Sequence, residues 1–65
     1  MLIVVNGEQK EIGPLSVLGL LEMLEIDPRR VAVELNLEIL PKPDYATTAL
    51  QDGDRIEIVQ FVGGG

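Results

Sequence analysis

Hydrophobic and polar positions near the start of the chain follow the pattern of a β-hairpin. Residues 2–5 are all apolar, and three of the four are β-branched, a composition that strands prefer. They end at Asn6-Gly7, a dipeptide that tolerates positive φ and favours a tight two-residue turn. A second strand is therefore expected over residues 8–12.

The pattern then changes to the spacing of an amphipathic helix. Ser16 can cap this helix, because its hydroxyl can accept a hydrogen bond from a backbone N–H of the first turn. Pro28 ends the helical region, since its ring forbids helix continuation. Gly19 weakens the helix by about 1 kcal/mol relative to alanine. The apolar residues that recur on one face are Val17, Leu20, Leu21 and Leu24.

Two short strands are expected after the helix. Residues 31–35 alternate between larger apolar side chains, which would face the core, and Ala32 and Glu34, which would face outward. This alternation predicts a half-buried strand. A turn at Asn36-Leu37 leads to residues 38–40, a short strand that Pro41 stops. Because proline cannot donate a hydrogen bond to a neighbouring strand, this second strand belongs at an edge of the sheet.

The segment that follows is expected to be irregular. Lys42 precedes a proline, which favours extended backbone, and a single helical turn is expected over residues 44–46. Tyr45 within this turn is expected to cover the edge of the core. Leu50 is expected to fill the core before a sharp turn over residues 51–54.

The order of the elements predicts the fold. Residues 55–62 alternate again and form the last strand, with Ile56 and Ile58 on its core face. Two strands, a helix and three further strands in about 65 residues match the ubiquitin-like β-grasp, an α+β fold with one main helix across a mixed sheet of about five strands. The first and last strands would be parallel neighbours at its centre. We expect a β-grasp domain over residues 1–62 and a flexible glycine tail over residues 63–65.

One face of such a sheet lacks a covering helix, and the sequence places several apolar residues there. Most of them lie on the first and last strands, which the fold sets side by side. Contiguous apolar patches usually mark partner sites, so we predict a contact surface. Its members are Leu2, Val4, Ala32, Val59 and Phe61.

Composition and charge narrow the range of partners. A chain of 65 residues, 46% hydrophobic and 25% charged, makes one folded domain and excludes most self-contained enzyme folds. Eleven acidic and five basic residues give a formal charge of −6. This charge argues against nucleic acid or an anionic membrane as partner and favours a basic protein.

The absence of two residue types limits the chemistry that the side chains can perform. Without cysteine or histidine the side chains offer no thiol nucleophile, imidazole base or zinc cluster, so we expect no catalytic residue and no metal site. The first residues carry no basic stretch, and no apolar segment approaches the length that spans a membrane. We expect a cytoplasmic protein that is a monomer when free.

Two charged motifs have both a functional and a structural interpretation. Asp52 and Asp54 flank a turn glycine, where short acidic side chains bond nearby backbone amides, and no further oxygen ligands lie at a spacing that suits a cation. Arg29-Arg30 could grip an acidic partner or a phosphate. Two adjacent arginines after a helix in an acidic chain are more often a solvated junction.

The last three residues, Gly63-Gly64-Gly65, are the strongest functional signal. No turn, cap or packing role needs three glycines at a free carboxyl end, although a frayed tail is the simplest alternative. A tail without side chains can thread a narrow channel and bring its carboxylate to an active site in another protein. The Gly65 carboxylate is therefore the candidate reactive group, with Gly63 and Gly64 as the threading segment.

Several motifs together resemble one family. They are residues 31–36, residues 38–39 with Pro41, residues 52–59 and residues 61–65. This combination is similar to the ThiS family, the sulfur carriers of thiamine biosynthesis, over nearly the whole chain. Leu37 departs from the pattern, because a glycine or a polar residue is expected at that turn position.

The resemblance implies a carrier and not an enzyme. An E1-like adenylating enzyme would use ATP and magnesium to convert the Gly65 carboxylate into an acyl-adenylate. Sulfur from a source such as a cysteine desulfurase would displace AMP and leave a thiocarboxylate, which thiazole synthase would use. Gly64 and Gly65 would take the family's functional positions, Gly63 would extend the arm, and the chain would need no cofactor of its own.

Three alternatives remain open from the sequence. A sulfur carrier for molybdopterin synthesis or transfer-RNA thiolation would use the same terminal chemistry with another acceptor. A ubiquitin-like modifier would join its activated terminus to lysines of other proteins. A plain β-grasp interaction module would make no covalent use of Gly65.

Overall fold

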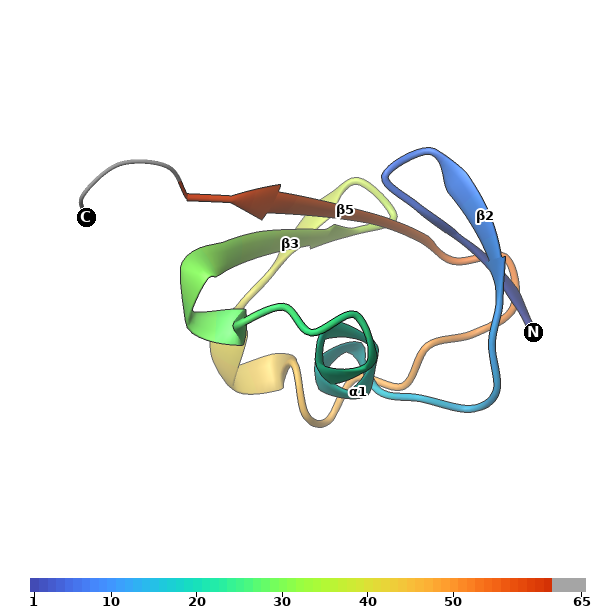
Figure 1. Ribbon diagram of the computed structural model, residues 1–65, viewed down its shortest axis with the longest axis horizontal. Helices are drawn as coiled ribbons and strands as arrows, with labels where there is room; N and C mark the ends of the chain where they lie inside the picture. Colours follow the sequence, from blue (N-terminus) through green and yellow to red (C-terminus); the bar gives the residue numbers. More distant parts are fainter. Residues whose placement is uncertain (62–65) are drawn as a thin grey trace.

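A five-stranded sheet lies over a single α-helix in the computed structural model, which describes residues 1–61 (Figure 1). The five strands and the start of the helix agree with the sequence prediction to within two residues. The helix, however, ends at Met23, and Pro28 opens a 3-10 turn that was not predicted instead of ending the helix. No helix in this part of the chain is long and apolar enough to cross a membrane. In chain order the elements are β1 (Leu2–Val5), β2 (Glu8–Glu11), α1 (Val17–Met23), the 3-10 turn η1 (Pro28–Arg30), β3 (Val31–Leu35), β4 (Glu38–Leu40), the 3-10 turn η2 (Lys42–Asp44) and β5 (Arg55–Gln60).

The sheet has the strand order β2-β1-β5-β3-β4. Strand β5 runs parallel to β1, where Val5 lies opposite Ile56, and antiparallel to β3, where Val33 lies opposite Ile58. The remaining pairs, β1 with β2 and β3 with β4, are antiparallel. The first and last strands are thus parallel neighbours at the centre, and the predicted β-grasp topology is confirmed.

Helix α1 is stabilised mainly by the face that it buries against the sheet. The hydroxyl of Ser16 accepts a hydrogen bond from the backbone N–H of Gly19 at 3.0 Å, which confirms the predicted N-cap. Leu20 and Leu21 are fully buried, and burial of each leucine is worth about 1.5–3 kcal/mol. This gain exceeds the cost of about 1 kcal/mol for Gly19, so a helix too short to be stable alone forms here.

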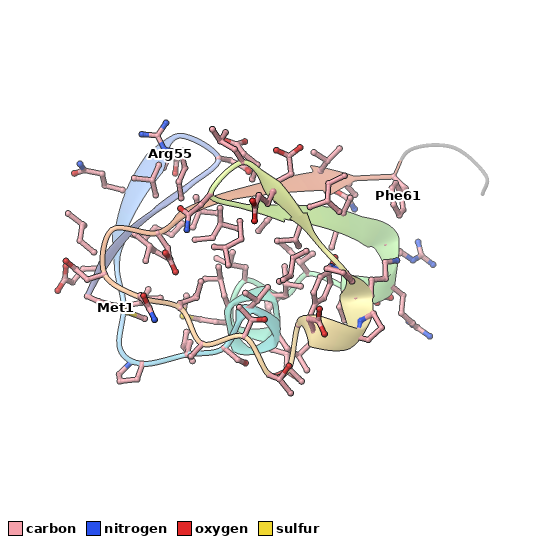
Figure 2. The ribbon with its side chains drawn as sticks, turned by 180° about the vertical axis from the view of Figure 1, so that it is seen from behind. Met1, Arg55 and Phe61 are labelled. Atoms are coloured by element: carbon pink, nitrogen blue, oxygen red, sulfur yellow. The ribbon has the colours of Figure 1, made fainter. Side chains whose placement is uncertain are left out.

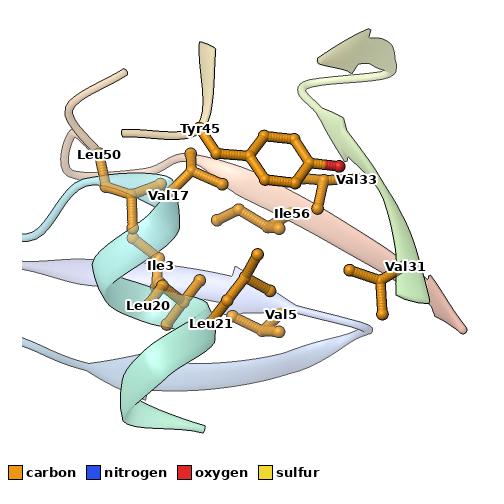
Figure 3. Packing of buried hydrophobic residues seen from close by; sticks show 10 residues of the cluster. All are labelled: Ile3, Val5, Val17, Leu20, Leu21, Val31, Val33, Tyr45, Leu50 and Ile56. Carbon is orange, nitrogen blue, oxygen red and sulfur yellow. The ribbon is translucent and has the colours of Figure 1, made fainter. Parts of the chain in front are cut away.

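The core fills the space between α1 and the inner face of the sheet (Figure 3). Tyr45 is only 3% exposed, so it belongs to the core itself and not to its edge. Leu50 is buried as predicted. Among residues 1–61 no charged side chain is buried. The ten core residues are Ile3, Val5, Val17, Leu20, Leu21, Val31, Val33, Tyr45, Leu50 and Ile56.

The segment after β4 differs from the prediction. Lys42 is not extended but opens the turn η2, and the extended residue is Pro41, with φ −64° and ψ 143°. The backbone N–H of Asp44 donates to the Pro41 carbonyl at 2.9 Å, and that of Tyr45 donates to the Lys42 carbonyl at 3.1 Å. These bonds and the burial of Tyr45 outweigh the preference of a residue before proline for extended backbone.

Candidate functional site

Strand β5 leads to the predicted reactive end of the chain. Val62 and the glycines Gly63, Gly64 and Gly65 lie outside the described residues, so the site is defined here by the strand that precedes them. This strand has a neighbour on each side, β1 and β3. Hydrogen bonding on both sides fixes the position of the strand that carries the terminal glycines.

The pairing of β1 with β5 continues beyond the end of β1 through the side chain of Asn6. The backbone N–H of Ile58 donates to Asn6 Oδ1 at 2.7 Å, and Asn6 Nδ2 donates to the Ile58 carbonyl at 3.2 Å. The side-chain amide therefore takes the place of a paired strand residue. The sequence indicated only a turn at Asn6, because these bonds join residues 52 positions apart and leave no local pattern.

A second asparagine holds the start of β5. The backbone N–H of Arg55 donates to Asn36 Oδ1 at 2.9 Å, and Asn36 Nδ2 donates to Asp54 Oδ1 at 3.0 Å. Asn36 and Leu37 form the turn between β3 and β4 with left-handed φ values of 52° and 72°. Asparagine tolerates this conformation, whereas leucine does so at a cost.

The two aspartates before β5 hold backbone in place, Asp54 at a nearby amide as the turn interpretation predicted and Asp52 at a distant one. Asp54 Oδ2 accepts from the backbone N–H of Gln51 at 2.8 Å. Asp52 Oδ1 accepts from the backbone N–H of Leu2 at 2.7 Å and so ties the turn to β1. Within residues 1–61 no three His, Cys, Asp or Glu side chains are grouped so that they could hold a metal ion.

Three segments meet where β5 ends. The backbone N–H of Phe61 donates to the Arg30 carbonyl at 2.9 Å. Lys42 Nζ lies 5.3 Å from the centroid of the Phe61 ring, within cation–π range, and donates to the Arg29 carbonyl at 2.8 Å. Figure 2 shows Phe61 at one end of the molecule and Met1 and Arg55 toward the other. We call Arg29, Arg30, Lys42 and Phe61 the exit corner.

Asp27 organises the two arginines of the exit corner. Its Oδ1 accepts from the backbone N–H of Arg29 at 2.9 Å and thereby caps η1. Its Oδ2 lies 2.9 Å from Arg29 Nη2 and 3.7 Å from Arg30 Nε. The hydrogen bonds from the Arg29 side chain and backbone lower the pKa of Asp27 from 3.8 to about 2. The carboxylate therefore stays charged at neutral pH, and both arginines remain largely exposed.

Four of the predicted contact residues, Leu2, Val4, Ala32 and Val59, lie on the outer face of the sheet but do not form one patch, and the ring of the fifth, Phe61, lies beside Lys42 of η2. Val59 is 54% exposed and lies opposite Ala32. Val4 lies opposite Arg55, four residues earlier on β5 and thus about 13 Å away along the strand. Leu2 lies farther still in the same direction. The expectation of one continuous surface is therefore wrong, because the strand register separates the two groups.

An exposed residue that the sequence analysis missed joins the group beside Phe61. Ile39 on the edge strand β4 is 78% exposed and lies opposite Glu34, which makes it a diagonal neighbour of Ala32 on the same face. Its three-residue strand is too short for alternation to reveal its facing. We call Ala32, Ile39 and Val59 the exit-side patch.

A mixed sheet of this order, crossed by one helix and centred on the strand that leads to a glycine-rich end, defines a ubiquitin-like β-grasp protein. The model of the ThiS family matches residues 3–65. The chain belongs to the ThiS family.

Similarity to individual proteins supports this family assignment. The crystal structure of the thiamine biosynthesis protein ThiS from Geobacter metallireducens matches with a TM-score of 0.86 and 36% identity, and both chains are covered completely. The sulfur carrier protein ThiS of Bacillus subtilis is 42% identical over 88% of this chain and 83% of its own length. A thiazole synthase of Paramagnetospirillum magneticum is 52% identical over all of this chain, which spans only 20% of that protein.

Proposed function

We propose that this protein is a sulfur carrier of thiamine biosynthesis and that the sulfur is carried on the carboxyl group of Gly65. The observation that carries the proposal is the extent of the family match, which runs from residue 3 to Gly65 and so includes both the β-grasp domain and the three glycines. The similarity to the sulfur carrier protein ThiS of Bacillus subtilis, at 42% identity, supports the carrier role.

The proposed chemistry belongs to the backbone terminus. In an E1-like adenylating enzyme, a Gly65 carboxylate oxygen attacks the α-phosphorus of magnesium-bound ATP, and pyrophosphate leaves. The terminal sulfur of a persulfide, formed by the desulfurase from cysteine, then attacks the acyl carbon, and AMP leaves. A thiol such as excess cysteine reduces the acyl disulfide that results, so that a thiocarboxylate and a new disulfide remain. Adenylation is needed because a free carboxylate is a poor electrophile with no good leaving group.

The protein acts in this scheme as a substrate of other enzymes and not as a catalyst. Three of its described carboxylates have structural partners: Asp27 caps η1, Asp52 holds β1, and Asp54 holds Gln51 and Asn36. These bonds support a scaffold that presents the terminus while the partner supplies the reacting groups.

Thiazole synthase is the proposed sulfur acceptor, and a cysteine desulfurase is the proposed source of the sulfur. Two thiazole synthases contain a stretch that is 52% or 41% identical to this chain, which places a domain of this kind together with that enzyme in other organisms. In the proposed complexes the glycines Gly63 and Gly64 thread the partner's channel, and exposed apolar residues near the end of β5, including Val59 and Phe61, contact the partner.

Intact-mass measurement tests the proposal. The purified chain is incubated with the adenylating enzyme, ATP, magnesium, the desulfurase and cysteine, and its mass is followed. We expect the mass gain of one oxygen-to-sulfur exchange, located at Gly65 by fragmentation. A variant that lacks Gly64 and Gly65 keeps the same domain and is expected to show no gain.

Other outcomes distinguish the alternative functions. Addition of this chain to lysines of other proteins would identify a protein modifier. A thiocarboxylate that thiazole synthase does not consume would point to a different sulfur acceptor. A chain that the adenylating enzyme leaves unchanged would contradict the carrier proposal.

A further inference from the structure

We propose that the exit corner docks on carboxylate side chains at the rim of the active site that receives Gly65. The proposal rests on the proposed function, since it requires an enzyme that takes up the terminal glycines. The proposal adds which chemical groups this enzyme must present around the entrance to its active site.

The charge of the exit corner is opposite to that of the rest of the chain. Arg29, Arg30 and Lys42 are three of the five basic residues, and the other two together with the eleven acidic residues would give a charge of −9. Among the described residues Asp27 is the acidic side chain that forms ion pairs with the corner. The exit corner together with Asp27 therefore has a net charge of +2 that a partner can contact.

Hydrogen bonds fix the corner to the end of β5. Phe61 is bonded to Arg30 through the backbone, and Lys42 is held between the Arg29 carbonyl and the Phe61 ring. Arg29 and Arg30 belong to η1 and Lys42 belongs to η2, but these contacts hold all three residues near the end of β5. A rigid arrangement of this kind reduces the entropy that a partner contact must otherwise overcome.

The short distance to Gly65 brings any tail-binding enzyme close to these charges. Gly65 is four residues beyond Phe61, and four residues span at most about 14 Å. An enzyme that holds the Gly65 carboxylate in its active site must therefore lie against the exit corner or within reach of its long side chains.

The geometry favours protein carboxylates over a nucleotide phosphate as the ligand. A phosphate site requires several donors that converge on one point. Here the Arg29 guanidinium is already paired with Asp27, with bonds of 2.9 and 3.1 Å, and Lys42 Nζ donates to a carbonyl. The remaining charges are spread over an exposed surface, which suits several separate carboxylates on a protein.

Charge reversal with a matched control tests the proposal. Arg30→Glu, Lys42→Glu and Lys10→Glu each change the net charge from −6 to −8, but Lys10 lies on β2 at the opposite edge of the sheet. The adenylating enzyme is assayed by carrier-dependent exchange of pyrophosphate into ATP. At low salt we expect the corner variants to raise the KM for the carrier about tenfold and Lys10→Glu to change it less than about twofold.

Further measurements separate this proposal from its alternatives. The corner variants should keep the wild-type kcat, and their KM should approach that of the wild type as salt screens the contact. Arg30→Gln and Lys42→Gln should give smaller changes of the same sign, and unfolding midpoints would identify any misfolded variant. Equal KM changes in all three reversal variants, or a change in the KM for ATP alone, would overturn the proposal. A wild-type chain without exchange activity would instead overturn the proposed function, and this inference with it.

Discussion

At the scale of single residues, the turn between β3 and β4 contains backbone strain that a substitution can remove. Leu37 has φ 72° and is 82% exposed, so no packing offsets a conformation that costs a non-glycine residue roughly 1–2 kcal/mol. We expect Leu37→Gly to raise the free energy of unfolding by about 1 kcal/mol. The measurement is the urea midpoint at an unchanged m-value. Leu37→Ala keeps the strained backbone, and an equal gain in that control would contradict this explanation.

Asn6 allows the contribution of its side-chain bonds to be separated from that of its backbone. Asn6→Gly retains a residue that accepts the φ of 48° but removes both hydrogen bonds to Ile58. Because Ile58 then loses its partners, we expect a loss of about 1–2 kcal/mol in unfolding free energy. Hydrogen exchange at the Ile58 amide should also accelerate. Asn6→Asp keeps the acceptor and should retain slow exchange; if both variants exchange alike, the amide does not hold β5.

At the scale of elements, the cap of η1 predicts a dependence of stability on acid. The pKa of Asp27 is about 2 in the folded protein, against an ordinary value of 3.8. The ionised carboxylate therefore contributes fully to the free energy of unfolding above the unfolded pKa, and this contribution is lost as the pH falls through the folded pKa. We expect Asp27→Asn to flatten the decline of unfolding free energy over this acid range relative to the wild type. The effect should shrink in high salt, because the pair is exposed. Parallel profiles of the two proteins would contradict the assignment.

The elements also show which parts of the structure the sequence can predict. The hairpin at Asn6-Gly7 and the start of helix α1 follow from local periodicity, turn chemistry and capping, and both were predicted correctly, whereas the helix ends at Met23 and not at Pro28. The turn at Lys42 was not, because the burial of Tyr45 overrides a local preference. The side-chain bonds of Asn6 and Asn36 to β5 depend on contacts between distant residues, which no local pattern encodes.

At the scale of the whole molecule, net charge and local charge lead to different conclusions about partners. A charge of −6 favours a basic partner, whereas the exit corner is positive and favours carboxylates beside the point of entry. The two can coexist if a partner presents acidic groups around its active site and basic groups farther away. The sequence contained all these charges, but only the fold shows that Lys42 joins Arg29 and Arg30.

The strand register makes a further prediction about which part of the outer face a tail-binding enzyme contacts. Val59 belongs to the exit-side patch next to Phe61, whereas Leu2 lies at the far end, and their exposures of 54% and 41% are similar. Because the glycines keep such an enzyme close to Phe61, we expect Val59→Asp to weaken its binding about tenfold or more. Leu2→Asp adds the same charge and should weaken binding less than about threefold. Binding is measured by calorimetry with the adenylating enzyme and with thiazole synthase. Equal losses for both variants would mean that the enzyme covers the full length of the sheet, and the division imposed by the register would then have no functional meaning.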